Sequence, residues 1–268
     1  MKKKRLIPVI LIKNGWVVQS RNFSLYNNLG NPIASVKRLS EWGSDELIFL
    51  DISKTSDHDT RRDDQNYPNR KTFLEIIEDV AKVTNMPLTA GGKISSIEDI
   101  KLRLKLGADK VSINTKAFND INFLKCAIRE FGSQCIVCSV DLKKVNNDFF
   151  VFINGGSKNT QIKGEVWLNE INQIGAGEVL LNFIDRDGQK NGFELEYVVK
   201  IKKKMTIPII LCGGAGSAEH FIEAIKTTDV DAIAAANFFH YSDQSVYYTK
   251  KALVNAGLNF REPLIIEV

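Results

Sequence analysis

Two kinds of apolar segment alternate along this chain of 268 residues, and the alternation is the strongest constraint on its fold. The short segments are almost continuously apolar, as expected of strands buried on both faces of a parallel sheet. They cover residues 6–12, 47–52, 87–90, 111–114, 135–140, 179–184, 207–212 and 232–236. Longer segments with helical periodicity lie between them, at residues 32–42, 71–84, 97–106, 121–131, 165–174, 194–204, 218–226 and 245–256.

Eight strand–helix pairs in a chain of this length predict an α/β fold, a single (β/α)8 TIM barrel spanning residues 1–268. An open doubly wound sheet is the main rival, but it does not need eight units, and no composition shift divides the chain into two domains. Ser96 and Ser217 are expected N-caps, and glycines stand where helices should stop, at positions 43, 107, 132, 175 and 257. The stretch around residues 147–154 predicts a small hairpin after the fifth strand.

The two halves of the chain resemble each other. GSDELIFLDIS matches GAGEVLLNFIDRDG, and TAGGKIS matches LCGGAGS, each followed by a helix and a strand of small residues. Any barrel repeats strand, turn and helix, but the matched order favours a duplicated half-barrel, with two equivalent sites facing each other across the mouth.

Composition narrows the class of protein further. Lys+Arg minus Asp+Glu is 36 − 32 = +4, and the basic residues are dispersed, so nothing indicates a nucleic-acid partner. The basic, apolar N-terminus is too short for a signal peptide, and no segment is long enough to predict a membrane span. The four cysteines, Cys126, Cys135, Cys138 and Cys212, predict reduced thiols in a cytoplasmic protein; Cys135 and Cys138 should point to opposite faces of one strand.

The carboxyl ends of the strands are where barrel enzymes work. Glycine turns there expose backbone N–H groups at helix N-termini and favour an anion, so two such clusters suit a ligand with a phosphate at each end. A tight strand–helix connection is the structural alternative at each turn. The candidate residues are Gly91, Gly92, Asn114, Thr115, Asp187, Gly188, Gly213, Gly214 and Asn237.

Asp141 follows a buried strand, so it is expected at the barrel mouth, where it could act as a general acid or base or merely hold a neighbouring loop. His58, His220 and His240 are not spaced as metal ligands, and we expect neither a metal nor another cofactor.

Charged residues begin four of the strands: Arg5, Glu46, Lys110 and Glu178. All four therefore belong at the bottom of the barrel. Two positive and two negative charges can form a neutral ring that plugs the core, which is the ordinary stabilising role of this face. Alternatively, the ring is a gate through which a small neutral molecule enters the barrel axis.

Ordered matches along nearly the whole chain resemble the HisF-type cyclase subunit of imidazole glycerol phosphate synthase. The motifs are KRLIPVILIKNG, GSDELIFLDIS, PLTAGGKISSIEDI, GADKVSINT, FGSQCIVCSVD, GAGEVLLNFIDRDGQKNG, CGGAGSAEHF and AAANFFH. In that family a glutaminase docks under the barrel and releases ammonia, which travels through it to a bis-phosphate substrate at the mouth. The products are imidazole glycerol phosphate and an aminoimidazole carboxamide ribotide, in histidine biosynthesis.

The resemblance implies a role for each matching position. Arg5, Glu46, Lys110 and Glu178 fall on the family's ammonia gate, which favours the gate over the plug. Asp109 and Gln134 fall near the place where a HisH-like glutaminase docks. Asp141 matches one of two catalytic aspartates. Asn114, Thr115, Asp187, Gly188, Gly213 and Gly214 match phosphate or substrate contacts, and Asn237 stands where the family often has serine.

Several positions depart from the family pattern. Leu11 occupies the place of the other catalytic aspartate, Gln19 replaces a lysine of the mobile first loop, and Lys93 replaces a third glycine. The charged loop over residues 53–70 also does not match. Leucine has no ionisable proton and cannot do acid–base work.

An intact ammonia gate together with a missing catalytic aspartate resembles a HisF-like branch involved in acetamidino modification of bacterial surface sugars. We therefore expect a subunit that takes ammonia from a glutaminase and passes it to a separate sugar amidotransferase. The first alternative is a working cyclase in which Asp141 alone carries catalysis. The second is a non-catalytic scaffold that uses the barrel only for docking.

Overall fold

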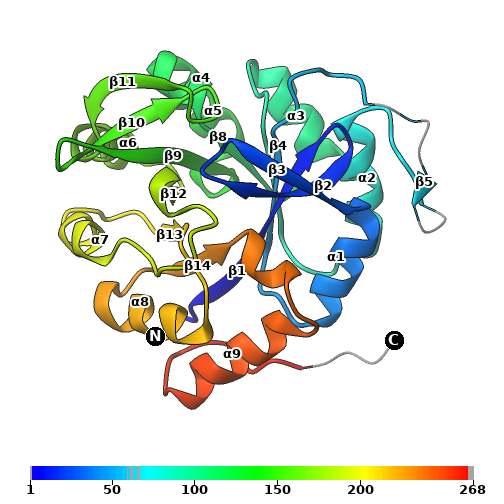
Figure 1. Cartoon of the computed structure of the whole chain (residues 1–268). Coiled ribbons are helices and arrows are strands. Elements are labelled where there is room, and N and C mark those ends of the chain that lie inside the picture. Colours follow the sequence, from blue (N-terminus) through cyan, green and yellow to red (C-terminus); the bar gives the residue numbers. More distant parts are fainter. Residues whose placement is uncertain (1, 59, 61–62, 65–66, 265–268) are drawn as a thin grey trace.

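Eight parallel strands close into a barrel in the computed structural model, which describes residues 2–58, 60, 63–64 and 67–264 (Figure 1). Hydrogen-bonded neighbours follow one another from the first strand to the eighth, and the eighth pairs with the first again. The barrel strands are β1 (Arg5–Lys13), β4 (Leu47–Asp51), β7 (Leu88–Gly91), β8 (Lys110–Ile113), β9 (Ile136–Val145), β12 (Glu178–Phe183), β13 (Ile209–Cys212) and β14 (Ala232–Ala235). The predicted TIM barrel is confirmed.

Helices surround the strands, and every predicted helix is present. The helices of the structure are α1 (Pro32–Glu41), α2 (Phe73–Val83), α3 (Ile97–Lys105), α4 (Thr115–Asn119), α5 (Ile121–Phe131), α6 (Gly164–Ile174), α7 (Leu195–Lys202), α8 (Ala218–Thr228) and α9 (Ser245–Asn255). Ser96 caps α3 in a reciprocal pair with Asp99. Ser217 stands at the N-cap of α8 but makes no side-chain capping bond.

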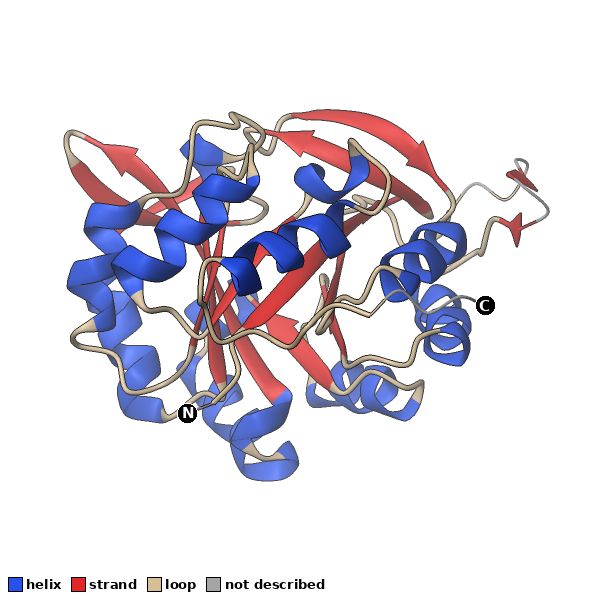
Figure 2. Ribbon diagram, turned by 90° about the horizontal axis from the view of Figure 1, so that it is seen from below, coloured by secondary structure: helices blue, strands red, loops and turns tan. Residues whose placement is uncertain are grey.

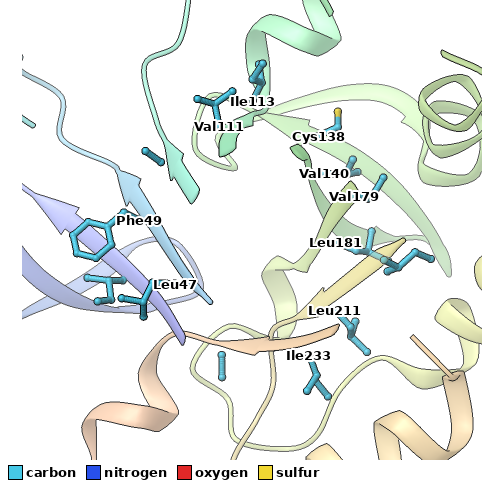
Figure 3. Close-up of a cluster of buried hydrophobic side chains, with 14 of the residues drawn as sticks. Leu47, Phe49, Val111, Ile113, Cys138, Val140, Val179, Leu181, Leu211 and Ile233 are labelled. Atoms are coloured by element: carbon cyan, nitrogen blue, oxygen red, sulfur yellow. The ribbon is translucent and has the colours of Figure 1, made fainter. Parts of the chain in front are cut away.

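Period-two alternation along the strands divides the buried residues into two layers. Side chains such as Phe49, Val111, Val140 and Leu181 point away from the barrel axis toward the helices (Figure 3). The other set fills the lumen: Ile7, Val9, Ile48, Val137, Leu180, Ile210, Cys212, Ala232 and Ala234. The residues facing the lumen are therefore every second residue of each strand.

Three short 3₁₀ segments adjoin the strands: η1 (Ser133–Cys135), η2 (Ile184–Arg186) and η3 (Asn237–His240). Cys135 ends η1, so the expectation that it shares a strand with Cys138 is wrong; β9 begins one residue later. Cys138 is buried on the outer side of the barrel wall.

The hairpin expected at residues 147–154 is larger than predicted. β9 runs on to Val145, pairs with β10 (Asp148–Ile153), and β10 pairs with β11 (Lys158–Lys163). Positive φ at Asn146 and Asn147 makes the first turn. The hairpin of β10 and β11 extends beyond the barrel rim, on the side opposite the N-terminus (Figure 2).

A second hairpin, β2 (Trp16–Arg21) and β3 (Leu25–Gly30), was not predicted at all. β2 also pairs with β1, and the pair Asn14-Gly15, both at positive φ, turns the chain between the paired residues Lys13 and Trp16. The turn between β2 and β3 has positive φ at Asn22 and Phe23. An Asn-Gly pair between apolar runs is a strong hairpin signal. The sequence therefore contained the evidence for the β1–β2 turn, which leads the chain into the β2–β3 hairpin.

The loop that departs from the family pattern, residues 53–70, lies partly outside the described residues. Its described part includes β5 (Asp63–Asp64) paired with β6 (Tyr67–Pro68). Within the described part of the chain, no helix is both long enough and apolar enough to cross a membrane.

Candidate functional site at the two ends of the barrel

Four charged side chains form one ion-paired ring at the bottom of the lumen. Arg5 lies 2.6 Å from Glu46 and 2.7 Å from Glu178, while Lys110 lies 3.0 Å from Glu46 and 3.2 Å from Glu178. Each cation thus bridges both carboxylates. Thr89 completes the ring by donating a hydrogen bond of 2.9 Å to Glu46.

Burial makes these pairs strong and mutually dependent. The Glu46 side chain is 2% exposed and the Lys110 side chain 17%. Desolvation lowers the pKa of Arg5, but the carboxylates of Glu178 and Glu46 outweigh it, so the pKa of Arg5 is raised above its ordinary value. An ordinary plug and a gate both need this arrangement, so the geometry is compatible with either.

Above the ring the lumen is apolar, with isolated hydroxyl groups. Ile7, Val9 and Leu180 line it, and Ser112 is buried with a hydroxyl that has no partner among the described residues. An apolar lumen favours a neutral molecule over an ion, because an ion would lose its hydration without replacement.

Asp141 ends the lumen at the mouth, where two amides hold it. Asn114 donates to its carboxylate at 2.7 Å and Asn182 at 3.1 Å. Desolvation raises the pKa of Asp141 to about 6, with the two amide bonds lowering it and Asp187 raising it. A carboxyl group with this pKa can both take up and release a proton near neutral pH.

Asn182 is a site residue that the sequence analysis missed. It lies two residues after Leu180 on β12, so the strand's alternation turns it into the lumen beside Asp141. Its parallel partner across the strands is Asp141 itself. The period-two pattern starting from Glu178 was the signal that could have found it.

Leu11 faces the lumen near the mouth, packed with the apolar cluster that includes Leu50 and Ala236. The neighbouring Asp51 does not replace the missing carboxylate. It accepts hydrogen bonds from Ser53 and forms an ion pair with Lys93 at 3.1 Å. In the folded structure, position 11 therefore presents an apolar side chain among apolar neighbours.

Three predicted substrate residues contact the β2–β3 hairpin. Asp187 accepts hydrogen bonds from the Ser20 hydroxyl at 2.7 Å and from the Phe23 N–H at 3.2 Å. Asn237 accepts from the Ser20 N–H at 3.0 Å and donates to the Ser20 carbonyl. A Cβ on Gly188 would lie 2.9 Å from that same carbonyl oxygen. The hairpin therefore rests on the mouth at the ends of β12 and β14.

The two glycine turns are structurally equivalent, with a shift of one residue from the sequence alignment. A Cβ on Gly92 would meet the backbone of Asp51, and a Cβ on Gly213 would meet the backbone of Phe183. Gly92 and Gly213 both have φ near +100°. Gly92 thus corresponds to Gly213, and Lys93 corresponds to Gly214. Gly91 precedes this turn and packs against Leu50 and Ser112.

Lys93 adopts φ +53°, the left-handed conformation that lysine tolerates at some cost. Its ammonium group contacts Asp51 and the Thr55 carbonyl. Gly214, in contrast, has φ +108°, which is outside that region. The two turns thus differ in backbone conformation at this position.

The remaining predicted residues lie at both ends. At the mouth, the Thr115 hydroxyl accepts a hydrogen bond from the Asn154 N–H at 3.0 Å. At the bottom, Asp109 and Gln134 are exposed, although one Asp109 oxygen accepts from the Leu88 N–H at 2.8 Å. Among the described residues no group of three or more His, Cys, Asp or Glu side chains could hold a metal ion.

Comparison with known proteins agrees with this arrangement. The family model described as "Histidine biosynthesis protein" matches residues 5–245. "Imidazole glycerol phosphate synthase subunit HisF" of Streptococcus mutans is 39% identical over 262 residues, covering 97% of this chain and all of the relative. The proteins of the same name from Flavobacterium psychrophilum and Sulfurisphaera tokodaii are each 40% identical over 261 residues, with the same coverage. The chain belongs to the family of HisF subunits of imidazole glycerol phosphate synthase.

Proposed function

We propose that this chain is the ammonia-accepting subunit of a glutamine-dependent synthase. The observation that carries the proposal is one lumen with the charged ring of Arg5, Glu46, Lys110 and Glu178 at one end and Asp141 at the other. The relatives are named as subunits, which supports a complex with a HisH-like glutaminase.

The glutaminase docks at the bottom, on the face that carries Asp109 and Gln134. Ammonia enters when Lys110 leaves the ring, because a single lysine side chain can swing aside while Arg5 still bridges both carboxylates. The neutral molecule then crosses the apolar lumen. Asp141, which Asn114 and Asn182 hold in place, acts as the general acid or base at the acceptor. We place this complex in the cytoplasm.

The first candidate acceptor is the ribonucleotide of the histidine pathway, with the chain acting as cyclase. The names of the relatives and the family match over most of the chain favour this candidate. The turns at Gly92 and at Gly213-Gly214, on opposite sides of the mouth, suit its two phosphates. Purified protein supplied with the substrate and ammonium salts should form imidazole glycerol phosphate, and no turnover would reject this acceptor.

The second candidate acceptor is a sugar amidated by a separate enzyme, and one observation favours it. Leu11 places a hydrocarbon side chain in the lumen, at the position of the family's second catalytic aspartate. Loss of a general acid or base lowers a rate by about 10²- to 10⁴-fold. Here the chain should stimulate glutaminase activity without cyclase turnover, and rescue of a cyclase-deficient histidine auxotroph would count against it.

A test at the bottom ring addresses ammonia passage for either acceptor. Charge reversal by Glu178→Lys breaks both cation contacts of that carboxylate. Glutamine-dependent activity should fall, while activity with added ammonium salts is kept. The matched control is Glu165→Lys on α6, whose pair with Lys204 is exposed. Unchanged glutamine-dependent activity in Glu178→Lys would instead favour a docking scaffold.

A further inference from the structure

A polar pocket outside the barrel contains an arginine that pairs with no carboxylate among the residues that the structure describes. The pocket has a volume of about 280 Å³ and is lined by Arg38, Trp42, His240, Tyr241, Ser242 and Asp243. Arg38 and Trp42 come from the end of α1, and the other residues join η3 to α9. None of these residues belongs to the lumen, the ring or the glycine turns.

The Arg38 guanidinium group lies over the Trp42 ring, 5.3 Å from its centroid. Its Nε is buried and has no hydrogen-bond partner. Within the described part of the chain, the side chain neither donates a hydrogen bond nor pairs with a carboxylate. Because a guanidinium group has five N–H donors in a fixed plane, a half-buried one without an acceptor favours an oxyanion from solution.

His240 adds a second unsatisfied group to the same pocket. Its Nδ1 is buried without a hydrogen-bond partner. Burial, with Arg38 as a second cause, lowers the pKa of His240 to about 4, so the ring is neutral at pH 7. A neutral imidazole offers one donor and one acceptor, and it adds no positive charge to that of Arg38.

The start of α9 follows the pocket residues closely along the chain. The 11-residue helix begins at Ser245, two residues after Asp243, and Gln244 at its N-cap makes no side-chain capping bond. Free N–H groups and the helix dipole at this end both favour a negative group. The exposed carboxylate of Asp243 at the rim limits the total negative charge that the pocket tolerates.

We propose that this pocket binds a small molecule through a single oxyanion group, a carboxylate or a phosphate monoester, held by Arg38. The volume falls just below the range of ordinary small-molecule sites and is too small for a macromolecule. The buried Trp42 ring lies beneath the Arg38 guanidinium group and supports it. The site is separate from the mouth, but His240 in its lining belongs to the same short segment, η3, as Asn237. An occupant would therefore contact the segment whose Asn237 accepts a hydrogen bond from Ser20.

The test is a titration of the purified full chain with inorganic phosphate and with acetate, at constant ionic strength set by sodium chloride. The readout is the indole N–H resonance of Trp42, assigned with Trp42→Phe. A saturable shift with at least one oxyanion is expected. Whichever of the two binds more tightly identifies the ligand as a phosphate ester or a carboxylate.

Two variants make the result specific to the pocket. Arg38→Gln should weaken binding at least tenfold, whereas Arg129→Gln, which removes an exposed arginine from α5, should change it less than twofold. The proposal is overturned if neither oxyanion gives a saturable shift, or if both variants weaken binding equally. The matched circular dichroism spectra of the variants check that each is folded.

Discussion

Asp141 owes its chemistry to its surroundings. Its carboxyl group is buried at the mouth, and its neighbours are two amides and a second carboxylate, Asp187. An isolated aspartate would be ionised throughout the physiological range, whereas a pKa of about 6 lets this one change protonation during a reaction. The position was predictable from the sequence, but the pKa required the packed structure.

Asp141→Asn should change the pH dependence of stability. Because burial raises the pKa from 3.8 to about 6, the folded wild-type protein loses stability as pH rises through that interval. The variant does not titrate there, so its free energy of unfolding relative to wild type should rise by about 1 to 3 kcal/mol between pH 4 and pH 8. Urea unfolding at both pH values measures this. Asp185→Asn, on the exposed rim, is the control, and a constant difference for Asp141→Asn would contradict the prediction.

Gly214 and Gly155 differ in what a side chain would meet. A Cβ on Gly214 would lie 2.1 Å from the Gly192 carbonyl oxygen, at φ +108°, while Gly155 has φ +64° and open space around it. Gly214→Ala should therefore destabilise the protein by about 3 kcal/mol or more, and Gly155→Ala by about 1 kcal/mol. Chemical denaturation checks both, and equal losses would show that the clash relaxes freely.

At the scale of elements, the β2–β3 hairpin links the first strand to the far side of the mouth. Ser20 connects it to Asp187 and to Asn237, which are 167 and 217 residues away in sequence. An Asn-Gly turn predicts that a hairpin forms, but not where it rests. The contacts with Asp187 and Asn237 depend on barrel closure, which places β14 beside β1 and brings the ends of β12 and β14 to the same mouth.

Ser20→Ala should loosen this hairpin without unfolding the barrel. The variant removes the donor at 2.7 Å from the buried Asp187 carboxylate and leaves it the Phe23 N–H. Loss of a hydrogen bond to a charged group is worth about 1.5 to 3 kcal/mol. Hydrogen exchange at the Phe23 amide should therefore quicken about tenfold or more. Ser24→Ala, which removes an exposed bond to the Arg21 carbonyl, should leave that amide almost unchanged.

At the scale of the whole molecule, the charged ring depends on every strand between its members. Arg5 lies 41 positions from Glu46 and 173 from Glu178, yet all are in contact. Replacing one member leaves the others buried with unbalanced charge. The ring thus ties the first half of the barrel to the second.

Glu46→Gln should reveal this dependence. The substitution leaves Arg5 and Lys110 sharing Glu178 alone, in a site where the Glu46 side chain is 2% exposed. Removing one partner of a buried pair destabilises a protein by about 3 to 5 kcal/mol. Calorimetry should show a large fall in melting temperature, while Glu165→Gln, whose pair with Lys204 is exposed, should change it little. A small effect of Glu46→Gln would mean that water screens the ring.

The sequence by itself determined the number of strand–helix units, their order, and the end of the barrel at which each strand begins and stops. These properties follow from local periodicity, so Arg5, Glu46, Lys110, Glu178 and Asp141 could be assigned to the correct ends of the barrel. Only the tertiary structure decided the rest: the pairing of the ring, the amides around Asp141, the one-residue shift between the glycine turns, and the pocket around Arg38. All of these join residues far apart in sequence, and their distances and desolvation exist only once the barrel has closed.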